Sequence, residues 1–79
     1  MEKLLTLLKY IIAELVTNKE EIKINEATSG KNVLYKVRVA EGELGRVIGK
    51  NGITATAIRG VMQAAALKDQ LNVKVEFLD

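Results

Sequence analysis

The chain has 79 residues, of which 48% are hydrophobic and 28% charged, and its formal net charge is +2. A chain of this length and composition forms one globular domain with a thin core, and it is neither disordered nor membrane-embedded. Because it contains no Cys and no His, it lacks disulfides, the common zinc ligands and the commonest general base, so we expect no metal, no other cofactor and no enzymatic activity.

The first predicted element is an amphipathic helix over residues 3–17, and Asn18 is a suitable stop because Asn tolerates left-handed backbone geometry. The aliphatic stripe of this helix recurs at helical spacing, at Leu4, Leu8, Ile11 and Leu15. The segment does not have the pattern of a signal peptide, because Lys9 interrupts the apolar stretch and Glu14 follows it. Apolar runs in the chain reach only four residues, so we expect no membrane span and a cytoplasmic location.

Two strands are predicted next. Residues 21–27 and 33–39 alternate between apolar and polar side chains, with a loop at 28–32 between them. In the second strand the outward positions include Lys36 and Arg38. These two cations are candidates for an extended binding surface, although outward residues of a one-sided sheet are usually just solvated.

The second half of the chain predicts a short helix at about 43–48, a longer helix at about 53–67, and a last strand over residues 72–78. Two glycines fall within or beside these helices. We interpret Gly45 as a packing glycine, and Gly60 as the site of a close contact within the fold or across a dimer, because Gly costs about 1 kcal/mol relative to Ala inside a helix.

The resulting order is helix, strand, strand, helix, helix, strand. Three strands with one apolar face each, and three helices to cover that face, predict an α+β fold of two layers. The carboxylate pairs of Glu20 with Glu21 and of Glu41 with Glu43 fall at expected element boundaries. We therefore interpret them as solvated helix caps rather than as acid–base catalytic pairs.

Positive charge is concentrated in one part of the chain. Residues 31–59 carry six basic side chains against two acidic ones, a net charge of +4, whereas the remainder carries −2. This asymmetry indicates a polyanionic partner.

The most distinctive segment is "GRVIGKNGIT" at residues 45–54, which holds three of the six glycines. A Walker-type phosphate loop is excluded, because three residues rather than four separate Gly45 from Gly49, and because Asn51 follows Lys50 where that loop needs Ser or Thr. A β-hairpin built on the Asn-Gly dipeptide is the structural alternative. The alanines and the 3.6-residue spacing that follow favour a helix there instead.

The remaining interpretation is a G-x-x-G turn between two helices, formed by Gly49, Lys50, Asn51 and Gly52. Glycines let the backbone approach a sugar–phosphate chain, and the start of the next helix presents free N–H groups and the positive end of its dipole. Lys50 adds positive charge, and the flanking Ile48 and Ile53 supply an apolar surface for bases. This arrangement predicts a grip on a nucleic-acid backbone.

The turn, preceded by an aliphatic pair and enclosed by two helices with a strand on each outer side, resembles the KH domain, whose G-x-x-G loop clamps about four nucleotides. The additional helix and strand before this core resemble the type II KH fold, which implies a mixed three-stranded sheet with three helices on one face. Over residues 1–79, and through "GRVIGKNGITATAIRGVMQAAA" in particular, the chain is similar to the KhpA (YlqC) family of small bacterial proteins that consist of one KH domain.

The resemblance implies a cytoplasmic RNA-binding protein that acts as an RNA chaperone on single-stranded RNA. It also implies a homodimer or a pair with a Jag-like partner, KhpB, and a role in cell-envelope homeostasis and cell length. Carried over by position, RNA contacts are implied for Gly49, Lys50, Asn51, Gly52, Ile48, Ile53, Arg46 and Arg59. For Arg59, a contact with phosphate and a pair with a neighbouring carboxylate both stay open. The rival hypothesis is a KH-fold adaptor for protein interaction or dimerisation with little RNA affinity of its own.

Overall fold

The computed structural model describes residues 2–78 and confirms the predicted fold class and element order. The regular elements are α1 (Glu2–Leu15), β1 (Lys23–Ser29), β2 (Asn32–Arg38), α2 (Leu44–Ile48), α3 (Ile53–Leu67) and β3 (Asn72–Leu78). Two short 3-10 helices, η1 (Lys19–Glu21) and η2 (Lys50–Gly52), lie in the connections. The predicted spans of the last helix and last strand agree with the observed ones, and the other ends differ by no more than two residues.

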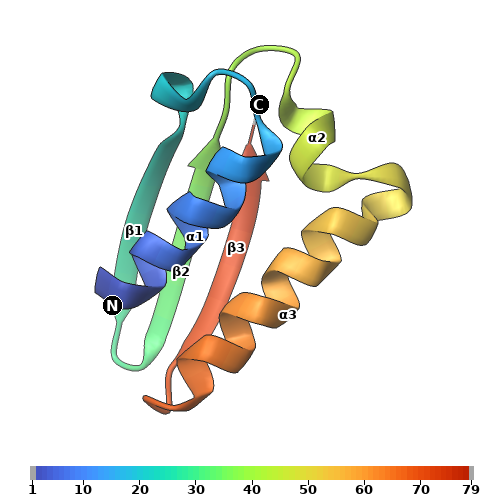
Figure 1. The fold of residues 1–79 in the computed structure, drawn as a ribbon. Coiled ribbons are helices and arrows are strands. Elements are labelled where there is room, and N and C mark those ends of the chain that lie inside the picture. The colour runs from blue at the N-terminus through green and yellow to red at the C-terminus, as the bar shows by residue number, and fades with distance from the viewer. Residues whose placement is uncertain (1, 79) are drawn as a thin grey trace.

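The three strands form one mixed sheet in the order β1-β2-β3, with β2 antiparallel to β1 and parallel to β3 (Figure 1). The loop predicted at 28–32 is shorter than expected, because Ser29 already pairs with Asn32. Only two residues remain for the turn, and the first of them, Gly30, has φ +60°. Tight hairpins of this length need such a positive φ, which Gly adopts without strain.

The helices cover one face of the sheet. Figure 1 shows α1 and α3 lying across this face, with α2 at the end of the sheet to which β2 leads. The core between the layers contains Leu8 and Ile12 from α1, Met62 and Ala66 from α3, and Val33, Tyr35, Val37, Val73 and Val75 from the sheet. The apolar face predicted for each strand therefore lies on the core at these residues of β2 and β3. Burial, and then the hydrogen bond with Glu26, raise the pKa of Tyr35 above its usual value.

Glu43 joins the end of the first helix to the start of the second. Its carboxylate accepts the backbone N–H of Thr17 at 2.6 Å and that of Asn18 at 3.1 Å, and the residue is only 6% exposed. The prediction of a solvated cap is therefore wrong for Glu43. The N–H groups of Thr17 and Asn18 lie just after the end of α1 and have no acceptor within the helix. The carboxylate of Glu43 is buried because it accepts both of them.

Candidate nucleic-acid interface

The candidate site is the turn between α2 and α3, residues 49–52, which we call the GxxG turn. Three of its four residues have positive φ: Gly49 at +75°, Asn51 at +58° and Gly52 at +74°. Gly adopts a positive φ without steric strain, and Asn tolerates it better than most residues with a side chain. The sequence Gly-x-Asn-Gly therefore matches the conformation that the backbone adopts, and Figure 1 shows the turn projecting away from the sheet.

Gly49 has a requirement that goes beyond φ alone. With ψ at 172°, it occupies a region that is essentially restricted to Gly. A Cβ atom built on Gly49 would also lie 2.7 Å from the Cβ and 2.9 Å from the backbone nitrogen of Thr54. Thr54 was not identified as a site residue from the sequence, since the close approach exists only once the turn has folded back on the start of α3. By contrast, a Cβ on Gly52 meets no atom within 4 Å.

The GxxG turn presents polar groups to solvent at the start of a helix. Lys50 and Asn51 are exposed. The turn is closed by the Gly52 N–H donating to the Gly49 carbonyl at 3.1 Å, and no side chain caps the beginning of α3. The first N–H groups of this 15-residue helix therefore face the turn together with the positive end of its dipole. Such a helix end is suited to a phosphate group.

The two flanking isoleucines have different environments. Ile48 is half-buried and packs against the core, whereas the side chain of Ile53 is 67% exposed. An exposed aliphatic side chain beside the start of α3 offers apolar contact to a base that leaves its stack. Ile53 thus leaves an aliphatic side chain exposed beside the GxxG turn, and Ile48 helps to hold the end of α2 on the core.

Arg59 makes two contacts that the sequence did not indicate, and a contact of Arg59 with phosphate stays a prediction. Its Nε donates to the backbone carbonyl of Val75 at 3.0 Å, and its guanidinium carbon lies 5.6 Å from the centre of the Phe77 ring. One turn further along α3, Gln63 donates to the carbonyl of Val73 at 3.5 Å. These side chains cover carbonyls on the edge of β3, so Arg59 is held beside that strand with its charge over an aromatic ring.

The other candidate cations divide between the two faces of the molecule. Arg46 lies on α2 with its side chain 60% exposed, and its Nε is 3.8 Å from the carboxylate of Glu43. Lys36 and Arg38 point to the sheet face opposite the helices, so they lie on the other side of the sheet from the helical layer that holds the GxxG turn. The structure therefore brings Arg46 to the helical layer with the turn and separates Lys36 and Arg38 from it.

Two glycines outside the turn make no close packing contact within the chain. A Cβ atom on Gly45 would meet no atom within 4 Å, so the packing role predicted for Gly45 is wrong. The Gly45 carbonyl instead accepts the N–H of Gly49 at 2.9 Å, where α2 ends. Gly60 also faces open space within the fold, so a packing contact inside one chain is wrong for it. A contact of Gly60 across a dimer stays a prediction.

No helix within residues 2–78 is both long enough and apolar enough to cross a membrane. The same part of the chain has no group of three or more acidic side chains gathered as potential metal ligands.

Comparison with known proteins gives consistent matches along nearly the whole chain. The KH-domain family model described as KhpA/KhpB matches residues 6–77. The RNA-binding protein KhpA of Chlamydia trachomatis is 35% identical over 72 residues, which cover 91% of this chain and 92% of the relative. The protein of the same name from Caldanaerobacter subterraneus is 39% identical over 72 residues, covering 91% and 96%. The one from Borreliella burgdorferi is 34% identical over 73 residues, covering 92% and 89%.

Proposed function

The chain belongs to the KhpA/KhpB KH-domain family, as the resemblance had indicated, and from this premise we propose that it binds single-stranded RNA through the GxxG turn and the adjoining apolar surface. The observation that carries the proposal is the geometry of the turn. Its left-handed backbone exposes Lys50 and Asn51 at an uncapped helix start, next to the exposed side chain of Ile53. Binding, not catalysis, is the activity that such a surface supports.

Each part of the site has a distinct task in this proposal. Phosphate oxygens accept the N–H groups at the start of α3 and approach Lys50, while Gly49 and Gly52 leave room for the RNA backbone. A base rests against Ile53, with Ile48 beside it. Arg46 and Arg59 add positive charge on α2 and α3. Since few cations take part, we expect weak affinity that falls as salt rises, with little preference for sequence.

The same family assignment supports a wider role. We propose that the protein acts as an RNA chaperone in the cytoplasm and that it works as a homodimer or with a KhpB-type partner. A role in cell-envelope homeostasis and cell length would follow through the RNAs that it binds. Weak, sequence-tolerant binding suits a chaperone, because such a protein must release each RNA after contact.

The direct test replaces the two exposed residues of the turn by carboxylates. We expect Lys50→Asp/Asn51→Asp to keep the fold, because Asp at position 51 still tolerates left-handed geometry. Its affinity for a short single-stranded RNA should fall roughly tenfold or more, because two negative charges then face the phosphates. Fluorescence anisotropy measures the affinity, and circular dichroism checks the fold.

The matched control is Thr6→Asp/Lys9→Asp on the exposed side of α1, which changes the net charge by the same amount. This control should bind RNA almost as the wild type does. Equal affinities of the turn variant and the wild type would contradict the proposal. If neither protein bound RNA while both formed dimers, the adaptor hypothesis would take its place.

One observation supports the dimer. Outside the GxxG turn, large hydrophobic side chains are exposed on the helical layer: Tyr10 on α1 at 65%, and Val61 and Leu67 on α3 at 48% and 73%. Gly60 lies beside Val61 with open space above it, so a second chain can approach α3 closely. A small domain gains stability by covering such residues with a partner.

We therefore predict that the wild type sediments as a dimer and that Val61→Glu/Leu67→Glu sediments as a monomer. Two buried carboxylates without partners would oppose association through this part of α3. Analytical ultracentrifugation gives the state, and the variant should still bind short RNA because the GxxG turn is unchanged. A monomeric wild type, or a variant that dimerises as well as the wild type, would contradict this assignment of the interface.

A further inference from the structure

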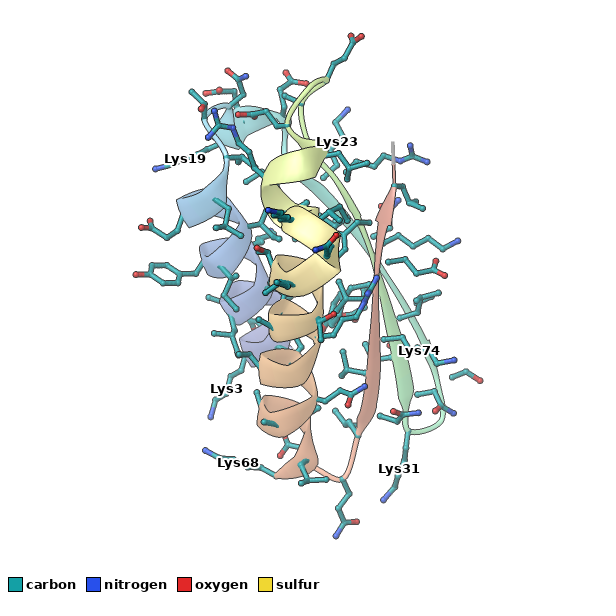
Figure 2. The ribbon with its side chains drawn as sticks, turned by 90° about the vertical axis from the view of Figure 1, so that its right-hand side faces the viewer. Lys3, Lys19, Lys23, Lys31, Lys68 and Lys74 are labelled. Atoms are coloured by element: carbon teal, nitrogen blue, oxygen red, sulfur yellow. The ribbon has the colours of Figure 1, made fainter. Side chains whose placement is uncertain are left out.

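The sheet face opposite the helices, which we call the open sheet face, is strongly basic. Its ionisable side chains are Lys23 of β1, Lys36 and Arg38 of β2, and Lys74 and Glu76 of β3. Four of these five groups are cations, so this face carries +3 although the whole chain carries only +2. Figure 2 shows Lys74 on the sheet side of the molecule, whereas Lys3 and Lys68 lie on the helix side.

The strand register brings the cations of the open sheet face close together. Lys23 lies directly opposite Arg38, and Lys36 follows two residues before Arg38 on the same face. Lys74 pairs with Leu34, which makes it a diagonal neighbour of Lys36, whereas Glu76 lies directly opposite Lys36. Like charges directly opposite each other destabilise a sheet. Glu76 offsets only one of the four cations, so a face with a net charge of +3 is better explained by a polyanionic ligand than by the stability of the sheet.

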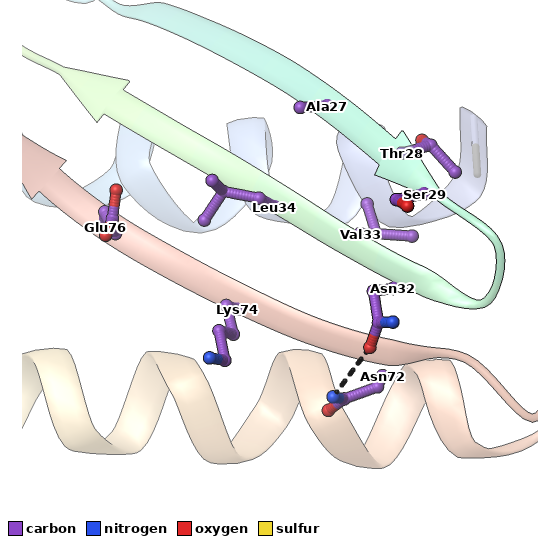
Figure 3. Close-up of a pocket in the computed structure, with 9 residues that line it drawn as sticks. All are labelled: Ala27, Thr28, Ser29, Asn32, Val33, Leu34, Asn72, Lys74 and Glu76. Atoms are coloured by element: carbon purple, nitrogen blue, oxygen red, sulfur yellow. Dashed lines mark hydrogen bonds between the residues drawn. The ribbon is translucent and has the colours of Figure 1, made fainter.

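A hollow of about 570 Å³ lies next to these cations on the same face (Figure 3). Leu34 and Ala27 provide an apolar surface in it, and Lys74 and Glu76 lie at its side. At one end the side-chain amide of Asn72 donates to that of Asn32 at 3.1 Å. Aliphatic surface with amide donors and acceptors beside it suits an unstacked base, which needs contact for its ring and hydrogen bonds for its edge.

We propose that the open sheet face is a second binding surface for single-stranded RNA. Phosphates follow the cations from Lys23 across β2 to Lys74, and a base enters the hollow at Leu34. This goes beyond the function proposed for the GxxG turn, because the two surfaces belong to different layers of the fold. An RNA of about four nucleotides fills the GxxG turn alone, and only a longer strand reaches both surfaces.

The charge of the open sheet face also argues against a second copy of the chain as its occupant. Two copies related by a two-fold axis present the same surface to each other. Pairing through this face would therefore bring two surfaces together that each carry +3, at a cost in repulsion. A polyanion meets no such repulsion. An acidic protein segment would also match the charge, and it is one of the outcomes that the experiment separates.

The test compares two charge-reversed variants by their affinity for short and long RNA. Lys23→Glu/Lys74→Glu alters the open sheet face and leaves Arg38 and Lys36 beside the new carboxylates, so the fold should hold. Lys3→Glu/Lys68→Glu gives the same net charge by changes on the helix side. For an RNA of about twelve nucleotides we expect about tenfold weaker binding by the first variant than by the second. The slope of log K against the logarithm of the salt concentration should also be smaller in magnitude by about 1–2 in the first variant.

A second measurement needs no variant. In an NMR titration of the wild type, the long RNA should shift the amide signals of β2 and β3 on the open sheet face, and an RNA of about four nucleotides should shift only those around the GxxG turn. Equal affinities of the two variants for the long RNA, with amide shifts confined to the GxxG turn, would overturn the second surface. So would shifts on that face that appear with an acidic peptide and not with RNA. If the wild type failed to bind the short RNA, the function proposed for the GxxG turn would fail independently.

Discussion

Replacing Gly49 by Ala is expected to lower the free energy of unfolding by about 3 kcal/mol. Two effects combine at this position. The backbone of Gly49 lies at φ 75° and ψ 172°, which an L-residue adopts only under strain. The added Cβ would also press against the side chain and backbone nitrogen of Thr54. Urea unfolding followed by circular dichroism measures the loss.

The matched control for this prediction is Gly52→Ala. Gly52 lies in the ordinary left-handed region, at φ 74° and ψ 12°, with no atom near the position of an added Cβ. Its replacement should therefore cost only about 1 kcal/mol. We expect Gly49→Ala also to weaken RNA binding more than Gly52→Ala does, because relief of the clash must move the turn from the start of α3. Equal losses of stability in the two variants would contradict the role given to Thr54.

Replacing Glu43 by Ala is expected to lower the melting temperature by several degrees. The change leaves the N–H groups of Thr17 and Asn18 without their acceptor. It thereby removes the hydrogen bonds that connect the end of α1 to the start of α2. Glu41→Ala, in the exposed turn just before, is the control and should have almost no effect. Since α2 leads into the GxxG turn, Glu43→Ala should weaken RNA binding as well. Equal melting temperatures of the two variants would contradict the stabilising role given to the hydrogen bonds of Glu43.

The pH dependence of Glu43 gives an independent check. The hydrogen bond from Thr17, with smaller help from Asn18 and Arg46, lowers the pKa of Glu43 below its ordinary value of 4.5, while burial opposes the shift. A lowered pKa in the folded state means that the carboxylate stabilises the fold above pH 4.5, and that this contribution is lost as pH falls through the folded pKa. Glu43→Gln keeps the shape but loses the charge and one acceptor. The wild type should therefore exceed Glu43→Gln in stability near neutral pH, and the difference should shrink in acid.

The fold followed from patterns that are local in the sequence. Period-2 alternation identified the strands and which side chains face the core, and 3.6-residue spacing identified α1 and α3. These signals are strong because each depends only on neighbours along one element. The shorter turn at Gly30 was missed because composition alone cannot tell a five-residue loop from a tight hairpin whose flanking residues pair.

The GxxG turn could be predicted for a similar reason. Gly49, Asn51 and Gly52 are residue types that tolerate positive φ, and the turn consists of little else. The sequence could not show how Arg59 would be used, because its two partners, Val75 and Phe77, belong to a strand that α3 meets only after folding. The roles of the individual residues in binding RNA stay predictions until the variants above are measured.

By itself, the sequence determined the order of the elements, the faces that form the core, and the conformation of the turn at residues 49–52, since these follow from backbone preferences and hydrophobic periodicity. Tertiary structure alone decided three further points: Glu43 is buried against a segment 26 residues away, Thr54 closes over Gly49, and the outward-facing Lys36 and Arg38 are joined by Lys23 and Lys74 from the neighbouring strands. Each of these depends on which distant segments come together, and a pattern within one element carries no information about its partners.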